Sequence, residues 1–597
     1  MRALLLLLPF LAYAAPATLL TQAEAKAALY RGTTAKAPPP SPFPLPETCL
    51  ANASIWFSVD LEMLAATEGS SPLQLFTSES VWQTLVEIGV EGVAFDHLRG
   101  AQTLGPDPKW GNAWPQVRQM AERRGMALIG NLIGNTLPPG PDFGFALQNV
   151  GDYPNLYHLI EIASKDWKLL PKLGPGQFEA NIPWLSLQEL CKLGYVPEDF
   201  TPYVKESAWN ASAPIEGVDG KVRRWIYLKE GKNNPVLSWL SPSFTAYRLA
   251  TGDALEGMYQ LGQTIFHVDG KIPPMAQEML ALWVRKIGGT TAASSSPFFE
   301  DLTTAKTDMV YETATRPALL HALLTQDTEA LRMTYRLYLD LGVTANRLVH
   351  ALFPFDEYVC DWVSLMNSPK QKFQYWEERI TGEVLRKRLL KEDLIRLECA
   401  QTIPQTTWVD YCARSLGVKD FENHKEELTR AHLLLAFTYA MQPGAFSFSA
   451  ADLLGALPDQ TQALELMGPN NNTLYASLPI QMTNPRSFAC QLKAILTARK
   501  EVNIENGELI SVLPSPHAGT LLLLYRLPTT RYLYLLAINF ARTAVAETFE
   551  LSDLANTWAI DVFTRLAEEK FFSSGKFSFI LPPMAGRAFY FQPKYYD

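Results

Sequence analysis

The sequence predicts an α/β chain, a (β/α)8 barrel of the TIM type with an insertion after its third strand, followed by an antiparallel β-sandwich. Three observations predict this architecture. Strand-like and helix-like segments alternate over most of the chain, as in parallel strands joined by crossover helices. The alternation is lost between residues 134 and 241, and the last hundred residues contain short strand-like runs separated by turn residues. A chain of 597 residues, 47% of them apolar, is long enough for two or three globular domains.

The first 15 residues have the pattern of a secretory signal peptide. Arg2 supplies the positive charge, residues 3–11 form the apolar segment, and Ala12-Tyr13-Ala14 is a small-residue cleavage site. The apolar run is shorter than the ~20 residues of a membrane-spanning helix, so a retained membrane anchor is the less favoured alternative. We therefore expect a secreted or periplasmic protein with no membrane span after cleavage.

A proline-rich segment follows the signal. It ends in the run Ala35–Pro46, which cannot form a helix or a central strand. We predict that residues 16–48 form an extended linker and that folded structure begins near Cys49.

Residues 49–502 are predicted to form the barrel, because apolar runs and amphipathic segments alternate along them. The eight strand-like runs are Ile55–Leu61, Val90–Phe95, Met126–Ile133, Gln263–Asp269, Thr290–Ser295, Asp308–Glu312, Asn346–Phe353 and Ala445–Phe448. The helix-like runs are Ser78–Ile88, Ala113–Arg124, Ser243–Leu261, Ala276–Ile287 and Pro317–Leu341.

Two parts of the chain depart from this alternation. Residues 134–241 contain proline, glycine and aromatic residues in irregular order, which indicates a lobe inserted after the third strand. From residue 503 to 597 the chain has short strand-like runs separated by proline, glycine and serine, which is typical of a β-sandwich. These runs are Glu508–Leu513, Thr520–Tyr525, Leu533–Asn539 and Arg587–Phe591.

Acidic residues follow two of the predicted barrel strands. Asp269 ends the fourth strand, and Asp356-Glu357 follow the seventh. Chemistry in such barrels takes place at the C-terminal ends of the strands, so Asp269 is a candidate nucleophile. Because both strands run in the same direction, we expect Asp269 and Asp356 to lie in one pocket. The alternative for each is a structural role, capping the helix that follows.

Several motifs of the chain resemble those of the α-amylase superfamily of glycoside hydrolases. They are Asp142-Phe-Gly-Phe145, Asp152–Glu161, Arg223–Leu228 and Phe266–Asp269, and they are most similar to the trehalose-synthase-like and maltose-glucosyltransferase-like branch. The resemblance extends from Cys49 to the end of the chain. It implies a retaining mechanism on α-glucosidic bonds, in which one carboxylate attacks the anomeric carbon and a second protonates the leaving oxygen.

The family's site residues are matched in part. The resemblance assigns Asp269 as the nucleophile and Asp356 as the acid that holds substrate hydroxyls. Four other substrate-binding positions carry different residues: His267 for an arginine, Asn131 for an aspartate, Thr136 at or near a histidine, and Phe355 for a histidine. An arginine is permanently charged, whereas a histidine carries a positive charge only when it is protonated.

The acid/base position after strand five carries no carboxylic acid. The resemblance places it near Ser294, and the nearest acids, Glu300 and Asp301, come after Pro297 and two phenylalanines. A serine hydroxyl cannot protonate a glycosidic oxygen as a carboxylic acid does, and loss of general acid catalysis lowers the rate by roughly 10²–10⁴-fold. Glu300 is the alternative acid, displaced from the expected position.

Composition limits the partners. The six cysteines form no CxxC pair and the resemblance implies no cofactor, so we expect neither a metal nor a cofactor. A net charge of −9 with scattered basic residues argues against a nucleic-acid partner. The expected ligand is an uncharged α-linked glucan or oligosaccharide, and no protein partner is specified.

Three sequons for N-glycosylation are present, at Asn52, Asn210 and Asn471. They matter in a eukaryotic secretory pathway.

Three functions remain open. The first is a secreted α-amylase-like protein with little or no hydrolytic activity that binds an α-glucan or oligosaccharide. The second is an active retaining glucosidase or transglucosylase that uses Asp269 as its nucleophile. The third is a non-enzymatic interaction scaffold without sugar affinity.

Overall fold

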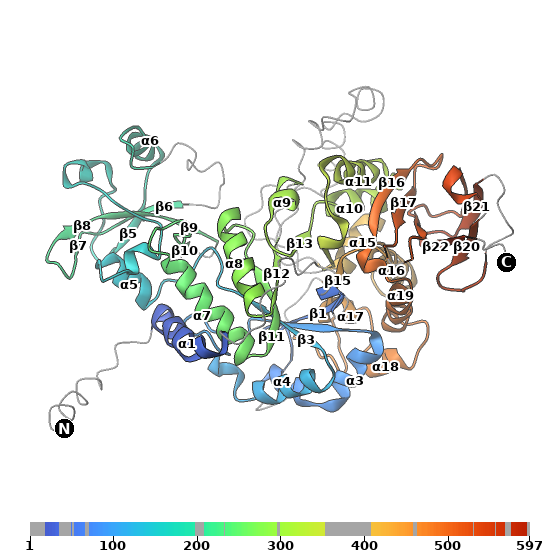
Figure 1. Cartoon of the computed structure of the whole chain (residues 1–597), viewed down its shortest axis with the longest axis horizontal. Helices are drawn as coiled ribbons and strands as arrows, with labels where there is room; N and C mark the ends of the chain where they lie inside the picture. The colour runs from blue at the N-terminus through green and yellow to red at the C-terminus, as the bar shows by residue number, and fades with distance from the viewer. Residues whose placement is uncertain are drawn as a thin grey trace. The chain divides into compact units, whose positions relative to one another are not determined.

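The structure is a computed structural model and forms two compact units. It describes residues 18–34, 49–50, 53–65, 71–196, 208–231, 233–294, 299–352, 407–418, 420–457, 463–528, 530–555, 557–567 and 575–593. The first unit comprises Met1–Pro40, Leu98–Pro108 and Asn131–Gly289. The second comprises Ser41–His97, Lys109–Gly130 and Thr290–Asp597. Labels of helices and strands follow Figure 1.

Eight parallel strands form a closed barrel in the order β1-β15-β14-β13-β12-β11-β3-β2. They are β1 (Ile55–Asp60), β2 (Gly92–Asp96), β3 (Ala127–Asn131), β11 (Gln263–Val268), β12 (Thr290–Ala293), β13 (Met309–Glu312), β14 (Leu348–Ala351) and β15 (Ala445–Ser449). Strand β1 is buried along nearly its whole length, as a parallel strand covered on both faces should be. Each strand overlaps one predicted run, which confirms the predicted (β/α)8 barrel.

The second unit contains most of the barrel helices. They are α3 (Glu79–Ile88), α4 (Trp114–Arg123), α9 (Phe299–Thr304), α10 (Arg316–Thr325), α11 (Glu329–Leu341), α15 (Trp408–Leu416), α16 (Lys425–Ala440), α17 (Ala450–Leu454), α18 (Leu478–Met482) and α19 (Phe488–Val502). The prediction of one helix over Pro317–Leu341 was wrong, since α10 ends at Gln326, whose φ of 58° is left-handed. The next turn is held by the C-terminal domain, because Thr328 donates its N–H to the carbonyl of Ala518 at 2.8 Å.

The prediction that residues 16–48 form a linker was wrong for part of this range. Residues Leu19–Thr34 form helix α1 in the first unit, where it packs against α7 (Thr245–Tyr259) and buries Leu19, Leu20 and Ala23. The prolines that suggested a linker begin after the helix, and the preceding alanine-rich segment contains none. The Pro-rich stretch and the predicted signal peptide lie outside the described residues.

The N-terminus of α1 is capped by a buried side chain from the inserted lobe. The Asp142 carboxylate accepts hydrogen bonds from the N–H groups of Leu19 (2.9 Å) and Leu20 (3.1 Å). Such a cap satisfies backbone donors that no helical carbonyl can reach. This long-range contact makes α1 an integral part of the first unit.

The insertion after the third strand is confirmed, and it forms a small antiparallel sheet with helices (Figure 1). Its strands are β4 (Leu159–Glu161), β5 (Glu179–Asn181), β6 (Ala208–Ser212), β9 (Trp225–Glu230) and β10 (Asn234–Pro235), with a hairpin of β7 (Ile215–Glu216) and β8 (Val222–Arg223). Helices α5 (Pro141–Leu147) and α6 (Trp184–Lys192) belong to it, and the first unit is completed by α7 and α8 (Pro274–Lys286).

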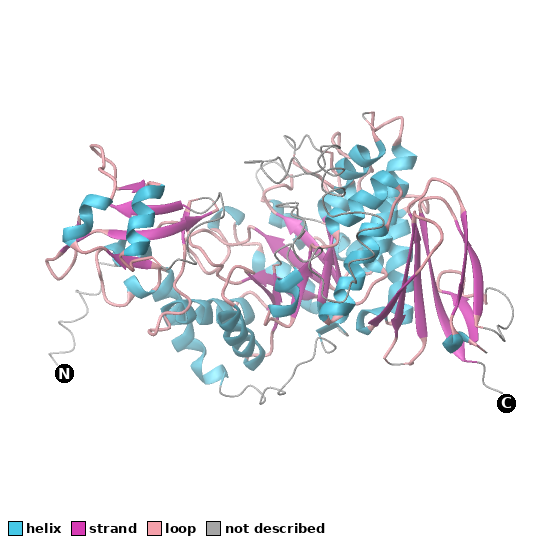
Figure 2. Cartoon of the chain, turned by 90° about the horizontal axis from the view of Figure 1, so that it is seen from above, coloured by secondary structure: helices cyan, strands magenta, loops and turns pink. Residues whose placement is uncertain are grey.

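Two antiparallel sheets form the C-terminal part of the chain, and Figure 2 shows them beside a layer of helices. One has the order β16-β17-β18-β22-β20 and the other pairs β19 with β21. Their bounds are β16 (Glu508–Leu513), β17 (Thr520–Arg526), β18 (Leu533–Asn539), β19 (Val545–Glu550), β20 (Thr557–Asp561), β21 (Lys576–Leu581) and β22 (Ala585–Pro593). Phenylalanines of β21 and β22 meet between the sheets, with the rings of Phe577 and Phe589 5.1 Å apart. This arrangement confirms the predicted antiparallel sandwich.

Within the described parts of the chain, no helix has the length and apolar character needed to cross a bilayer.

Candidate functional site

The candidate nucleophile Asp269 directly follows β11 and is partly buried. Its Oδ2 accepts the backbone N–H of Asn135 at 2.8 Å, and its Oδ1 accepts that of Lys271 at 3.0 Å. A Cβ atom on Gly134 would lie 3.0 Å from Oδ2, so the close approach of this backbone favours glycine. The carboxylate therefore fixes the loop that follows β3 as well as its own turn.

The other two residues predicted near Asp269 in the first unit lie together. Nδ1 of His267 lies 3.0 Å from Oδ1 of Asn131, so this ring nitrogen carries the proton and donates it. The backbone is joined at the same level, since Leu132 donates its N–H to the carbonyl of His267 at 2.9 Å. Burial lowers the pKa of His267 to about 4. At neutral pH the imidazole is uncharged and does not replace the positive charge of an arginine.

A buried carboxylate missed by the sequence analysis supports this loop from beneath. Asp253 on α7 is fully buried and accepts the N–H of Ile133 at 2.8 Å. Arg99 pairs with the other carboxylate oxygen. Burial raises the pKa of Asp253, although the Arg99 guanidinium and the Ile133 N–H favour its charged form. Its role is to position the loop after β3.

The acid/base position has the predicted side chain. Strand β12 ends at Ala293, and Ser294 follows it with an exposed side chain. Glu300, the alternative acid, lies in α9. Phe355, Asp356 and Glu357 lie outside the described residues, so a shared pocket for Asp269 and Asp356 stays a prediction.

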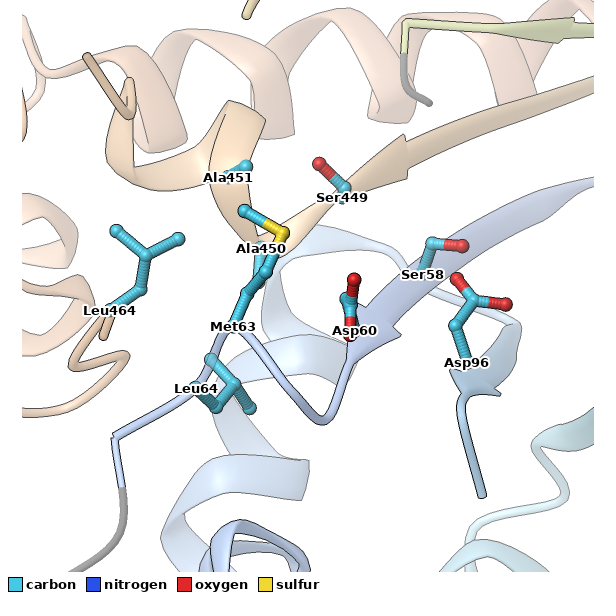
Figure 3. Close-up of a pocket in the computed structure, with 9 residues that line it drawn as sticks. All are labelled: Ser58, Asp60, Met63, Leu64, Asp96, Ser449, Ala450, Ala451 and Leu464. Carbon is cyan, nitrogen blue, oxygen red and sulfur yellow. The ribbon is translucent and has the colours of Figure 1, made fainter. Parts of the chain in front are cut away.

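A pocket that the sequence analysis missed lies at the C-terminal ends of β1, β2 and β15 in the second unit. It is lined by Ser58, Asp60, Met63, Leu64, Asp96, Ser449, Ala450, Ala451 and Leu464. Asp60 and Asp96 are register partners on neighbouring strands, as are Ser58 and Ser449. Side chains two residues apart on a strand share a face, so Ser58 and Asp60 face the same space. Figure 3 shows both carboxylates directed into the pocket, opposite an apolar wall that includes Leu464.

The two carboxylates of this pocket have different surroundings. Oδ1 of Asp60 accepts the backbone N–H of Glu62 at 2.9 Å and lies 3.0 Å from Nδ1 of His97. Although burial acts to raise it, these hydrogen bonds hold the pKa of Asp60 below its ordinary value. The same contact with Asp60 raises the pKa of His97. Asp60 is therefore an ionised hydrogen-bond acceptor at neutral pH.

The backbone at His97 is held in an uncommon conformation. Its φ of 59° lies in the left-handed region, which costs a residue with a side chain free energy unless the surroundings fix it. Here the indole N–H of Trp110 donates to the His97 carbonyl at 2.8 Å. One sequence signal could have indicated this pocket, because Asp60 and Asp96 each end an apolar strand and those strands are neighbours in the barrel.

A third carboxyl group lies beneath the pocket. Asp452 on α17 accepts hydrogen bonds from the N–H (2.7 Å) and the hydroxyl (2.9 Å) of Ser449, and its own N–H donates to that hydroxyl. Burial raises the pKa of Asp452 to about 7. This capping box orients Ser449, which lines the pocket.

No set of three or more His, Cys, Asp or Glu side chains in the described ranges is arranged to hold a metal ion.

Solved structures with the same architecture are α-amylase-type enzymes. An α-amylase from H. orenii superimposes with a TM-score of 0.58 at 10% identity, covering 91% of this chain and 100% of the other. The acarbose complex of the Geobacillus thermoleovorans α-amylase gives 0.52 at 12% identity, with 91% and 99% covered. Trehalose-6-phosphate hydrolase from Bacillus licheniformis gives 0.53 at 11% identity, also with 91% and 99% covered. No protein-family model and no curated protein matches the sequence.

These similarities establish the fold: the chain is an α-amylase-fold protein, with the catalytic-type barrel, the lobe after strand three and the C-terminal sandwich. Identities of 10–12% do not carry an activity over to this chain.

Proposed function

We propose that this chain is an exported α-amylase-fold protein that binds an α-glucan or oligosaccharide and hydrolyses it little or not at all. The observation that carries the proposal is the residue that follows β12, where Ser294 stands in place of a carboxylic acid. A glycosidic oxygen is a poor leaving group unless it is protonated as the bond breaks. Without that proton donor the rate falls by roughly 10²–10⁴-fold.

The state of Asp269 supports the same proposal. Both of its oxygens accept backbone N–H groups, and such hydrogen bonds stabilise the negative charge and lower the nucleophilicity of the carboxylate. The neighbouring His267 is neutral above a pKa of about 4. The side chain is thus suited to holding two loops, whereas a nucleophile needs a free oxygen and a nearby charge.

The pocket of the second unit supports a polyhydroxylated ligand. Two hydroxyls and two carboxylates face one space, and carboxylates accept hydrogen bonds from sugar hydroxyls. The wall formed by Met63, Leu64 and Leu464 can contact the apolar face of a sugar ring. Binding of this kind needs no acid catalyst and no metal. The Geobacillus thermoleovorans structure of the same fold has acarbose bound.

Export is part of the proposal. Its support is the signal-like pattern of residues 1–15, together with the position of α1. Cleavage after Ala14 would leave the buried Thr18 as the fourth residue of the mature chain, next to the first turn of α1. An exported chain trimmed at this point keeps every residue of the helix.

The test compares binding with hydrolysis on the purified mature chain. Maltooligosaccharides of increasing length are titrated calorimetrically, and the release of reducing ends from maltose and starch is measured in parallel. We expect saturable binding with hydrolysis near background. Robust hydrolysis abolished by Asp269→Asn would establish the active enzyme instead, with Glu300 as the first candidate acid. Absence of binding to any α-glucan would favour the interaction scaffold.

A further inference from the structure

Three consecutive asparagines, Asn470, Asn471 and Asn472, lie in the loop between α17 and α18 of the second unit. Asn470 is tied to Glu465 twice, since its Oδ1 accepts the Glu465 N–H at 2.8 Å and its Nδ2 donates to the Glu465 carbonyl at 2.6 Å. The carbonyl of Asn472 accepts the N–H of Leu457 at 3.1 Å. These contacts order the loop on both sides of Asn471.

Asn471 differs from its two neighbours. Its side chain is exposed, and it takes part in none of the hydrogen bonds between described residues. It is also the first residue of the sequon Asn471-Asn472-Thr473. The hydroxyl of Thr473 donates to the carbonyl of Tyr475 at 2.7 Å, so the third position of the sequon is fixed. The loop therefore presents one free amide on an ordered backbone.

The sequon at Asn210 has the opposite surroundings. Asn210 is 3% exposed in β6, an interior strand of the lobe sheet, where it pairs with Asn181 of β5 and Tyr227 of β9. A glycan is bulky and hydrophilic and needs a surface position. A glycan on Asn210 would prevent the sheet from closing. The third sequon, at Asn52, lies outside the described residues.

We propose that Asn471 is an N-glycosylation site of this chain in a eukaryotic secretory pathway and that Asn210 is not modified in the folded protein. The proposal rests on the export included in the proposed function. In the reaction the Nδ2 atom of Asn471 attacks the anomeric carbon of a lipid-pyrophosphate-linked oligosaccharide. The new C–N bond replaces the bond from that carbon to the pyrophosphate oxygen, and the lipid pyrophosphate leaves as the amide loses one proton.

The test uses the full chain secreted from eukaryotic cells, in an Asn52→Gln background that leaves two sequons. One version keeps its own first 15 residues, and a second carries a strong heterologous signal so that entry into the pathway is assured. We expect a gel-mobility shift of one glycan, removed by peptide N-glycosidase F and absent from Asn471→Gln. Thr473→Ser keeps the sequon and should keep the shift, whereas Thr473→Ala should lose it.

Peptide mapping after enzymatic deglycosylation identifies the modified asparagine, because the enzyme converts it to aspartate. Conversion at Asn471 with an unmodified Asn210 supports the proposal. Secreted, folded protein with no conversion at Asn471, or with a glycan on Asn210, overturns it. Secretion with the heterologous signal alone would contradict export of the native chain, a result separate from the state of Asn471.

Discussion

The imidazole of His267 donates from Nδ1 to Oδ1 of Asn131 at 3.0 Å, directly before the candidate nucleophile in the chain. Both residues occupy positions that carry charged side chains in the α-amylase-like motifs. Here a neutral donor meets a neutral acceptor, because burial lowers the pKa of His267 to about 4. The pair maintains a hydrogen bond between β11 and β3 without supplying charge for catalysis.

The first prediction concerns the protonation of His267. Its pKa of about 4 lies below the ordinary value of 6.5, so the unfolded chain binds the proton first. The free energy of unfolding should therefore decrease as pH falls from about 6.5 to about 4. The Cε1 proton resonance of His267, assigned with His267→Gln, should not titrate between pH 8 and pH 5. His97, whose pKa Asp60 raises, is an internal control that should titrate in the same spectra. A His267 midpoint near 6.5 would contradict the neutral pair.

A second prediction follows from Asp452, whose pKa burial raises to about 7. The unfolded chain loses this proton near pH 4, so the charged form destabilises the fold as pH rises from about 4 to about 7. Asp452→Asn keeps an oxygen that can accept both Ser449 hydrogen bonds and carries no charge. Its unfolding free energy should match that of the parent at pH 4 and exceed it above pH 7, by urea denaturation at each pH. Asp452→Ala, which loses the cap, should be less stable at pH 4 by about 1 kcal/mol.

Helix α1 supplies a third prediction. A Cβ atom on Gly252 of α7 would overlap the backbone of Ala23, so Gly252→Ala should displace α1. We expect a lower melting temperature and faster proteolysis within residues 19–34, because the contacts of Leu19, Leu20 and Ala23 would be lost. Gly144→Ala in α5 is the matched control, since nothing lies within 4 Å of its added Cβ. Equal proteolysis of the two variants would show that α1 is not held by this contact.

The pocket of Asp60 and Asp96 gives a fourth prediction, which rests on the proposed sugar binding. Asp96→Asn replaces an acceptor-only carboxylate by an amide and should weaken oligosaccharide binding by about tenfold, since a hydrogen bond to a charged group contributes about 1.5–3 kcal/mol. Glu62→Gln is the control, because the Glu62 side chain pairs with Lys109 and does not line the pocket. Titration calorimetry of both variants provides the comparison. Unchanged affinity of Asp96→Asn would place the ligand elsewhere.

The last prediction tests the acid/base position. An α-glucosyl fluoride needs almost no protonation of its leaving group, so the parent protein should cleave it slowly while leaving maltose intact. Ser294→Glu should raise maltose cleavage by up to roughly 10²-fold if sugar still binds beside His267 and Asn131. Asp269→Asn should remove the fluoride activity, because no carboxylate would remain after β11 to attack. Fluoride release unchanged by Asp269→Asn would exclude Asp269 as the nucleophile.

The parts of the fold that the sequence predicted depend on local patterns. A parallel strand buried on both faces is a continuous apolar run, so β1 and β11 were recognised from composition alone. The break between α10 and α11 was missed because the apolar pattern continues through it. It is set by the left-handed Gln326 and by the contact of Thr328 with Ala518, about 190 residues away.

The candidate site divides in the same way. The sequence by itself determined which side chain follows each barrel strand, including Ser294 after the fifth and Asp269 after the fourth, because strand order and strand ends are local properties. The tertiary structure alone decided what those side chains do. Hydrogen-bond partners and burial are set by loops distant in sequence, as when Asn135 engages Asp269 and desolvation makes His267 neutral. Pairing of β1 with β2 is likewise a long-range choice, and it alone brings Asp60 and Asp96 into one pocket.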